Sequence, residues 1–493
     1  GTVIVSAVAE TSDVKKVVSP NLSSEENTTL IYIPFTKGGF HLGGSSFAQV
    51  LGQLGNEVPD ITDPAFFANA FAGIQKLVAE GLILAGHDVS AGGLVTTLLE
   101  MAFPEEKPGM DVDLSVLGEN DLVKVLFSES PAVVIQVKDT DHVRSALKEA
   151  GVSHQVLGTV TSDGILTIQH QASGIRYPVA TLRDTWFRTS YLLDRKQCGE
   201  QLALERFTNY KNHPLKFRFP EPFTGKASQY GIDPARRKPT GIKGAIIREK
   251  GVNRDRDMAW AMYLAGFDVK DVHMTDLISG RETLDDVNFI AFVGGFSNSD
   301  VLGSAKGWAG AFMYNQKAKE TLNRFFARPD TLSLGVCNGC QLLVELGLIY
   351  PGHELHPRMS WNDSHKYECT FVNVSILENH SVMLKSLTGT RLGIWVAHGE
   401  GKFNFPYAEE RYHIPAKFSY SKYPGNPNGS MYDAACIASD DGRHLAIMPH
   451  LEDSVLPWQW PNYPAGRTDE VTPWVEAFVN ARKWVEEALG IRQ

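Results

Sequence analysis

The chain has 493 residues, of which 43% are hydrophobic and 21% charged, and its formal net charge is −10. This length and composition indicate about two to four globular domains. The negative charge does not favour general binding to nucleic acid, and no apolar run approaches the ~20 residues that span a membrane. Five cysteines without regular spacing are typical of a reducing compartment, so we expect a cytoplasmic protein.

The chain begins at Gly1 and not at a methionine, and residues 2–8 have the pattern of a β-strand. We therefore expect a processed chain or a fragment that begins inside a domain.

Residues 1–185 mix strands and helices without a regular alternation, which predicts an α+β domain. Apolar, β-branched runs predict strands, and amphipathic runs predict helices. The expected strands are 29–34, 83–88 and 133–137, and the expected helices are 47–54, 66–80, 94–101 and 141–150.

A glycine-rich loop, residues 38–46, connects the first of these strands to the first helix. Backbone N–H groups converge where such a loop enters a helix, and they can hold a phosphate. Gly43, Gly44 and Ser45 are therefore candidate phosphate- or nucleotide-binding residues. No Gly-Lys-Ser/Thr follows, so the loop is not a Walker A motif.

Residues 186–240 are predicted to be a helix followed by a surface connector, because the second part is rich in Pro, Gly, Lys and Arg. From residue 241 to 493, strands alternate with helices. This alternation predicts an α/β domain with a mostly parallel sheet and helices on both faces.

The most informative segment runs from Gly335 to Gln341, with the sequence Gly-Val-Cys-Asn-Gly-Cys-Gln. A strand pattern precedes it and a helix pattern follows, so Cys337 lies at a strand-to-helix elbow. The helix N-terminus favours a thiolate there, and a thiolate is a nucleophile. A buried strand far downstream ends in His450 and Glu452. In an extended segment these two side chains point to one face, which predicts a Cys-His-Glu triad.

Three other segments fit this interpretation. The strand 288–293 ends in two glycines, and the Gly295 N–H, together with that of Asn338, is predicted to stabilise an oxyanion. A third strand, 394–398, leads into a polar turn that contains Gly399 and Glu400. A further buried strand, 245–248, opens this half of the chain.

Two alternatives exist for the Cys-x-x-Cys spacing of Cys337 and Cys340. It also occurs in redox pairs and in half-sites for zinc. Zinc would need a second pair, and Cys198, Cys369 and Cys436 stand alone. Neither alternative uses the elbow glycine or Gln341. We expect Cys340 to be a packed small residue.

The motifs GVCNGCQ, GGFS, AHGEG, NPNGS and MPHxE together resemble class I glutamine amidotransferase domains. More narrowly, with residues 251–277 and 294–308, they resemble the glutaminase of the large phosphoribosylformylglycinamidine synthase family. The resemblance runs over nearly the whole chain, with Leu451 at a position where the family usually has proline. It implies glutamine as substrate, with Gln341, Gly399 and Glu400 in its binding site. It also implies that the chain is the C-terminal portion of a longer enzyme.

The first 185 residues resemble the C-terminal domain of the aminoimidazole ribonucleotide synthetase superfamily. This resemblance implies a bound ATP or ADP and gives Asp88 a role in holding Mg²⁺ on the nucleotide. Ala91 stands where the family has an acid, and alanine cannot supply a carboxylate there. Without the resemblance, Asp88 is as well explained as a cap for the turn after it.

The resemblance therefore predicts a glutamine-dependent ligase of purine biosynthesis. Glutamine would be hydrolysed at the triad, and its ammonia would be used with ATP to convert formylglycinamide ribonucleotide to the amidine. The N-terminal remainder of the same enzyme would be its partner. The alternatives are a stand-alone glutaminase or γ-glutamyl hydrolase of the same fold, and a non-catalytic subunit that binds nucleotide.

Overall fold

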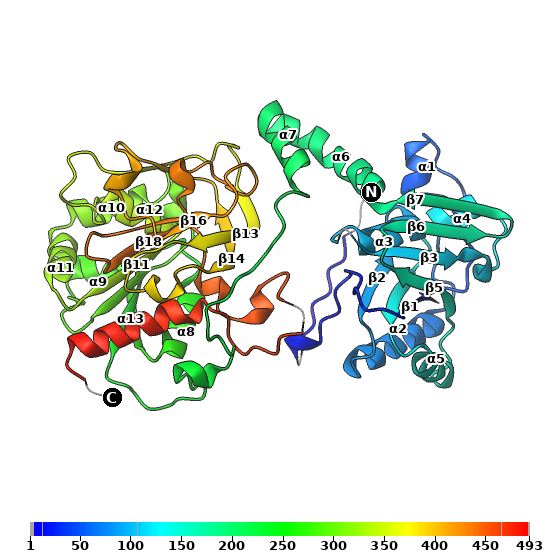
Figure 1. Ribbon diagram of the computed structural model, residues 1–493, viewed down its shortest axis with the longest axis horizontal. Coiled ribbons are helices and arrows are strands. Elements are labelled where there is room, and N and C mark those ends of the chain that lie inside the picture. Colours follow the sequence, from blue (N-terminus) through cyan, green and yellow to red (C-terminus); the bar gives the residue numbers. More distant parts are fainter. Residues whose placement is uncertain (1–3, 12, 106, 465, 492–493) are drawn as a thin grey trace. The chain divides into compact units, whose positions relative to one another are not determined.

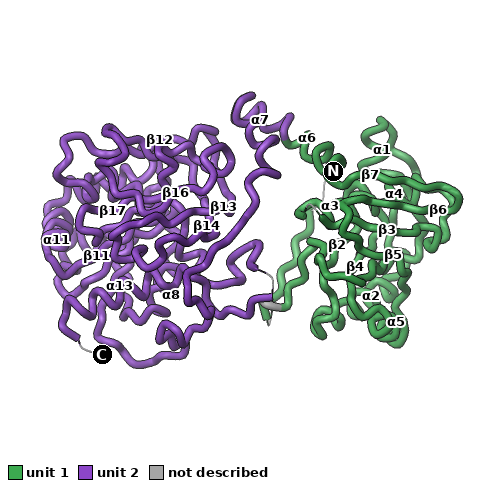
Figure 2. The backbone as a smooth tube through the Cα atoms, viewed as in Figure 1, with its two compact units in different colours: residues 1–190 green, residues 191–493 purple. Residues whose placement is uncertain are grey.

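The computed structural model describes residues 4–491 except 12, 106 and 465. The chain divides into two compact units, residues 1–190 and 191–493 (Figures 1 and 2). Residues 4–8 have no regular structure, and the side chains of Ile4, Val5 and Val8 are exposed. The strand predicted there is therefore wrong for the described residues, because no neighbouring strand pairs with them. Residues 2 and 3 of that prediction lie outside the described part. The helices of the described chain include none with the length and hydrophobicity to cross a membrane.

The first unit is built on one seven-stranded sheet in the order β2-β4-β1-β5-β3-β6-β7. Neighbouring strands are antiparallel except β3 and β6, which are parallel. Its strands are β1 Thr29–Pro34, β2 Ala85–Val89, β3 Gly109–Asp113, β4 Ala132–Val137, β5 Gln155–Thr161, β6 Ile165–His170 and β7 Ser173–Pro178.

Helices cover both faces of this sheet. Alternate residues of β1 point to opposite faces, so Leu30 and Tyr32 join the core under α3 and α4, whereas Ile31 and Ile33 join the core under α2 and α5. The helices are α1 Ser46–Val50, α2 Pro64–Ala79, α3 Gly93–Ala102, α4 Leu122–Phe127 and α5 Thr140–Glu149. The prediction of an α+β domain is confirmed.

Two helices follow where the sequence predicts one. They are α6 Val179–Gln197 and α7 Gly199–Asn209. The chain changes direction at Cys198 and Gly199, and Gly199 has a φ of 82°, which glycine adopts without strain. Within residues 210–240, the longest element is a short 3₁₀ turn at Ala227–Tyr230.

The second unit has a six-stranded sheet in the order β17-β18-β11-β10-β8-β9. All neighbours are parallel except the edge strand β17. The strands are β8 Lys243–Arg248, β9 Asp268–His273, β10 Phe289–Phe292, β11 Leu332–Val336, β17 Cys436–Ala438 and β18 His444–Ile447. This confirms the predicted α/β fold.

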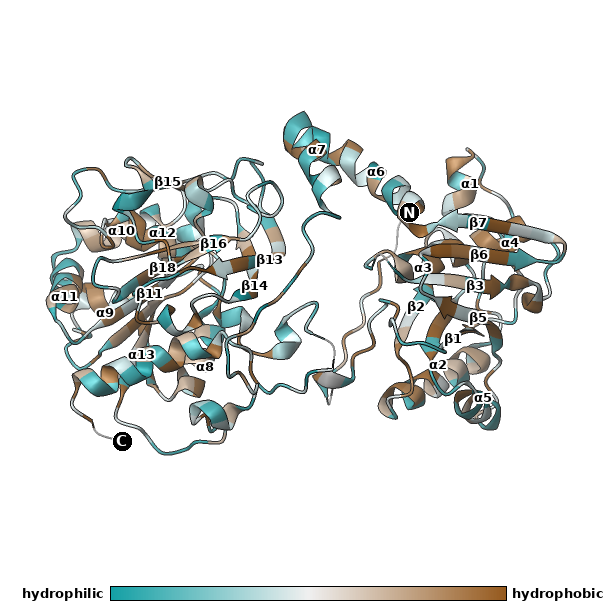
Figure 3. Cartoon of the chain, viewed as in Figure 1, coloured by the Kyte–Doolittle hydropathy of each residue, from teal (hydrophilic) through white to brown (hydrophobic). Residues whose placement is uncertain are grey.

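Every residue of the central strands β10 and β11 is buried, whereas most residues of the edge strand β9 are half-buried. Figure 3 shows brown, hydrophobic strands in the sheet and teal, hydrophilic residues along α13. Its helices are α8 Asp255–Ala265, α9 Met274–Ser279, α10 Lys306–Tyr314, α11 Gln316–Ala327, α12 Asn338–Glu345 and α13 Val475–Ala488.

Two smaller sheets belong to the same unit. One has the order β14-β13-β16, formed by β13 Glu368–Ile376, β14 Arg391–His398 and β16 Ala416–Phe418. The other pairs β12 Arg358–Ser360 with β15 Lys402–Asn404. An isolated bridge between Trp395 and His450 connects β14 to the segment after β18. That bridge positions the candidate histidine.

Candidate active site

Cys337 lies at the carboxyl end of β11 and caps α12, as the sequence predicts. Its φ of 51° and ψ of −106° are sparsely populated for a residue with a side chain, which is typical of a strained functional elbow. A Cβ on Gly339 would lie 2.1 Å from the carbonyl oxygen of Phe292, and one on Gly335 would lie 2.5 Å from that of Gly339. Glycine is therefore required on both sides of the cysteine.

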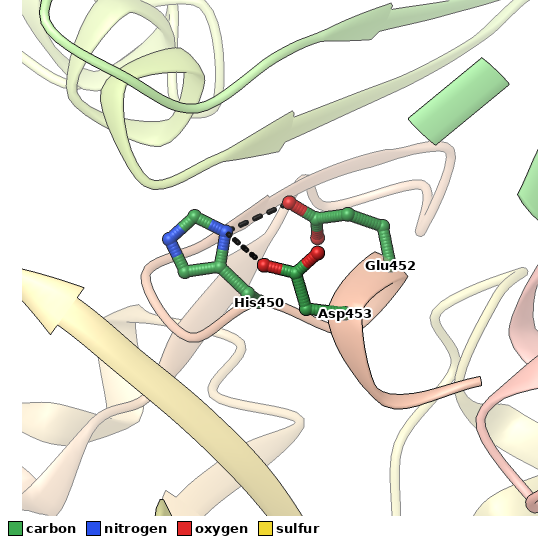
Figure 4. A group of neighbouring side chains, drawn as sticks. All are labelled: His450, Glu452 and Asp453. Atoms are coloured by element: carbon green, nitrogen blue, oxygen red, sulfur yellow. Dashed lines mark hydrogen bonds and ion pairs between the residues drawn. The ribbon is translucent and has the colours of Figure 1, made fainter. Parts of the chain in front are cut away.

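His450 and Glu452 lie together in the interior. Nδ1 of His450 is 2.7 Å from Oε1 of Glu452, and their side chains are 3% and 0% exposed (Figure 4). The predicted contact is present, but the predicted extended geometry is wrong. β18 ends at Ile447, Leu451 has helical dihedral angles, and Glu452 begins a 3₁₀ turn. The turn, and not a strand face, places the carboxylate on the imidazole.

The charges around His450 favour its imidazolium form. Burial alone lowers the pKa of His450, but the Glu452 carboxylate and the Cys337 sulfur raise it, and the net result is well above the ordinary value. Nε2 of His450 is buried without a hydrogen-bond partner among the described residues. That nitrogen is therefore available to give a proton to a leaving group.

A second acid, Asp453, borders this pair. Its Oδ2 is 3.9 Å from Nδ1 of His450 and 2.9 Å from Nε of Arg254. Burial and the Glu452 charge raise the pKa of Asp453 to about 6. His450, Glu452 and Asp453 also form the one group of three metal-type ligands within the described residues (Figure 4). In this structure the three are engaged with one another and with Arg254.

Cys337 and His450 meet at Gly294. A Cβ on Gly294 would lie 2.8 Å from Cε1 of His450 and 3.3 Å from Cβ of Cys337, so glycine is needed where the two side chains converge. Both line a small cavity of about 30 Å³, with the further lining residues Asn253, Arg254, Gly295, Phe296, Tyr367 and Ala397. This space holds about one water, so an amino acid substrate requires the cavity to open.

The two predicted oxyanion donors lie on either side of the nucleophile. Gly295 lines the cavity, and Asn338 follows Cys337 at the first position of α12. Among the described residues, no backbone hydrogen bond uses the N–H of either residue. The side chain of Asn338 instead accepts from the Ser297 N–H and donates to Gln341, which fixes the loop after β10.

The predicted glutamine-binding residues are brought together behind the cysteine. Gln341 donates to the carbonyl oxygen of Glu400 at 2.8 Å, and its own side-chain oxygen accepts from Asn338. Gly399 accepts from the Asn362 N–H. None of Gln341, Gly399 and Glu400 is among the residues that line the cavity.

The sequence did not single out Arg254, Tyr367 or Asp453. Arg254 and Tyr367 line the cavity. The Tyr367 hydroxyl donates to the carbonyl oxygen of Ala397, and Sγ of Cys337 is 3.7 Å from the same oxygen. Arg254 belongs to a run of charged residues that is typical of the exposed start of a helix, and Tyr367 precedes a strand. Neither pattern indicates a functional residue. Of these three residues, only Asp453 could have been found from the sequence, because it directly follows Glu452.

In the first unit, the amides of the glycine-rich loop donate hydrogen bonds within the chain. The N–H groups of Gly43, Gly44 and Ser45 donate to the carbonyl oxygens of Glu57, Leu54 and Leu42. In this conformation these three amides are therefore paired within the chain. The helix that follows, α1, has only five residues.

A carboxylate that the sequence analysis missed lies between this loop and the turn after β2. Oε1 of Glu129 accepts from the N–H of Ser46 at 2.7 Å and from that of Gly92 at 2.9 Å. Asp88 lies just before that turn, with 68% of its side chain exposed and Oδ1 at 3.3 Å from Nδ1 of His87. A single exposed carboxylate fits one position in a Mg²⁺ shell that phosphate oxygens and water complete.

Two family models match the chain. Residues 242–485 match the family model described as CobB/CobQ-like glutamine amidotransferase domain. Residues 30–171 match the one described as AIR synthase related protein, C-terminal domain.

The chain is 40% identical to the probable phosphoribosylformylglycinamidine synthase, chloroplastic/mitochondrial, of Arabidopsis thaliana, over 99% of this chain and 36% of that protein. It is 39% identical to the human phosphoribosylformylglycinamidine synthase, over 99% of this chain and 38% of that protein. The chain is a homologue of the phosphoribosylformylglycinamidine synthases over 99% of its own length. It spans less than two fifths of the length of these relatives.

Among solved structures, the chain is similar to that titled "Structure of PurLQS from Thermotoga maritima". The identity is 23% and the TM-score 0.39, over 50% of this chain and 99% of the other.

Proposed function

We propose that residues 241–493 are the glutaminase domain of a phosphoribosylformylglycinamidine synthase, a ligase of purine biosynthesis. Residues 1–185 would be its aminoimidazole ribonucleotide synthetase C-terminal-like domain, and residues 186–240 the connector. One observation carries the proposal: a strained elbow cysteine, Cys337, beside a histidine that is buried against a carboxylate. This arrangement activates a thiolate for attack on an acyl carbon.

The first half-reaction breaks the carboxamide of glutamine. Cys337 Sγ attacks the carboxamide carbon, and the developing oxyanion accepts from the N–H groups of Gly295 and Asn338. Each such donor contributes about 3–4 kcal/mol to transition-state stabilisation in well-studied cases. His450 Nε2 gives its proton to the departing nitrogen, the C–N bond breaks, and ammonia leaves a γ-glutamyl thioester on Cys337.

The second half-reaction restores the enzyme. The now neutral His450 takes a proton from water, the hydroxide attacks the thioester carbon, and the C–S bond breaks to release glutamate. Glu452 keeps Nδ1 protonated and orients the ring, so that Nε2 faces the sulfur. The buried carboxylate at 2.7 Å suits this orienting role.

The ammonia would be used in the full-length enzyme, which would also contain the N-terminal remainder of the protein. There, ATP activates the amide oxygen of formylglycinamide ribonucleotide, and ammonia displaces the phosphate to give the amidine. A nucleotide bound at residues 1–185 would take Mg²⁺ with Asp88 as one oxygen ligand, and Mg²⁺ would neutralise the phosphates. We place the enzyme in the cytoplasm, in agreement with its unpaired cysteines.

The stand-alone glutaminase or γ-glutamyl hydrolase is the weaker alternative. Such an enzyme does not need a first unit that matches the aminoimidazole ribonucleotide synthetase-related family. The two functions differ in ammonia use. In the full-length protein, Cys337→Ala should abolish synthesis of the amidine from glutamine and leave synthesis from ammonium salts. Equal loss with both nitrogen sources would contradict the proposal.

The nucleotide part has its own test. Calorimetric titration of the full-length protein with ADP should show Mg²⁺-dependent binding, and Asp88→Asn should weaken it about tenfold or more. Equal affinity in the wild type and the variant would leave Asp88 as a cap for the turn after β2.

A further inference from the structure

Arg254 carries a permanent positive charge at the wall of the cavity that contains Cys337. The other lining residues in the described chain are uncharged apart from the reacting pair, Cys337 and His450. No role in the chemistry above requires a guanidinium at this position. Its placement therefore needs a separate explanation.

The stem of Arg254 lies beside the reacting groups. Its Cγ is 3.4 Å from the position that a Cβ on Gly294 would occupy, the same point that His450 and Cys337 approach. The Arg254 side chain is 36% exposed, so solvent reaches part of it. Nε is 2.9 Å from Asp453, whereas Nη1 is 4.0 Å from Asp257, beyond hydrogen-bond distance. Neither Nη atom donates a hydrogen bond to the residues that the structure describes, so four N–H donors remain for a ligand.

We propose that the guanidinium of Arg254 binds the α-carboxylate of glutamine and sets the preference for substrates with a free α-carboxylate. The inference rests on the proposed glutaminase function. With the carboxamide at Cys337, the charged end of the same molecule would meet the other lining residues, among which Arg254 is the only cation besides His450 in the described chain. A planar guanidinium holds a carboxylate through two parallel hydrogen bonds, which neither Phe296 nor Tyr367 can supply.

Arg254 also pairs with Asp453, which contacts His450, so a purely structural role must be separated from substrate binding. The variant Asp453→Asn removes the ion pair and keeps the guanidinium. If Arg254 acts on substrate, this variant retains the preference for the α-carboxylate. If Arg254 acts only by holding Asp453, the variant reproduces the loss seen on substitution of Arg254, and the proposal is wrong.

The test compares glutamine with glutamine α-amide, which lacks the negative charge, as substrates of the full-length protein. Arg254→Gln should lower kcat/KM for glutamine about 10- to 100-fold, mainly through KM, because a charge-assisted pair is lost. The rate with the α-amide should change less than about twofold, and Arg254→Lys should recover part of the preference. An equal loss for both substrates, or an unchanged preference, would overturn the assignment.

Alkylation rates separate this inference from the proposed function. In the wild type, 6-diazo-5-oxo-L-norleucine, which carries an α-carboxylate, and iodoacetamide, which does not, should both modify Cys337. Arg254→Gln should slow only the first reaction, by a similar 10- to 100-fold. Equal rates of the first reaction in both proteins overturn the role of Arg254 alone. Failure of the wild-type Cys337 to react with the amino acid reagent overturns the glutaminase proposal itself.

Discussion

Nδ1 of His450 lies 2.7 Å from Oε1 of Glu452, although the strand that leads to them ends at Ile447. The turn after β18 brings the carboxylate back onto the ring, and the bridge from His450 to Trp395 holds the backbone of His450 against β14. Two neighbouring segments thus fix the imidazole without a continuous strand. The proposed general acid requires such rigidity, because it must transfer a proton at one fixed position beside the sulfur.

The two partners of this contact should differ in their importance. His450→Ala removes the proton donor, whereas Glu452→Gln leaves it and weakens only its orientation and charge. We expect glutaminase kcat to fall by at least about 10³-fold for His450→Ala and by a smaller factor for Glu452→Gln. Steady-state rates of glutamate release measure both. A larger loss for Glu452→Gln would mean that Glu452 contacts the substrate or that the roles are reversed.

Asp453 should destabilise the folded protein at neutral pH. Burial and the charge of Glu452 raise its pKa to about 6, above its ordinary 3.8. Between these values the folded state keeps a proton that the unfolded state has lost, so this carboxyl's contribution to the free energy of unfolding falls as pH rises through about 6. Asp453→Asn should therefore gain stability relative to wild type with rising pH, up to about 3 kcal/mol.

Denaturant unfolding from pH 4 to 8 measures this difference. Glu487→Gln is the control, because Glu487 lies at an exposed position of α13. The control should show a flat difference across the range. A flat difference for Asp453→Asn as well would mean that Arg254 compensates the buried charge fully.

Glu129 should hold two loops of the first unit together. Its carboxylate accepts from the N–H groups of Ser46 and Gly92, and Glu129→Ala leaves both amides without this partner. We expect a loss of about 2 kcal/mol in local stability, seen as faster hydrogen exchange at these two amides. Glu149→Ala, at an exposed helix position, should leave their exchange unchanged. Unchanged exchange in Glu129→Ala would show that the loops hold their shape without the carboxylate.

Much of the second unit could be predicted from the sequence because its signals are local. The elbow needs a cysteine between glycines where a strand becomes a helix, and Gly335, Cys337 and Gly339 supply this pattern within five residues. Buried parallel strands such as β10 and β11 are continuous apolar runs, which the sequence displays directly.

Contacts that depend on tertiary packing could not be predicted from the sequence. Nothing local marks Arg254, which reaches the cavity only because α8 begins beside Gly294. The glycine-rich loop was predicted to offer amides to a phosphate. Residues 54 and 57, ten or more positions downstream in the chain, supply the carbonyls that two of these amides use instead. Residues 4–8 have a strand's composition but no neighbouring strand to pair with.

The identity of the nucleophile is the central claim. Cys340 lies three residues from Cys337 but is fully buried, and burial raises the pKa of its thiol well above the ordinary value. The most direct measurement treats the full-length protein with 6-diazo-5-oxo-L-norleucine and maps the adduct by peptide mass spectrometry. We predict one adduct, on Cys337, that glutamine prevents and that His450→Ala slows. Modification of Cys340 with Cys337 untouched would contradict the account.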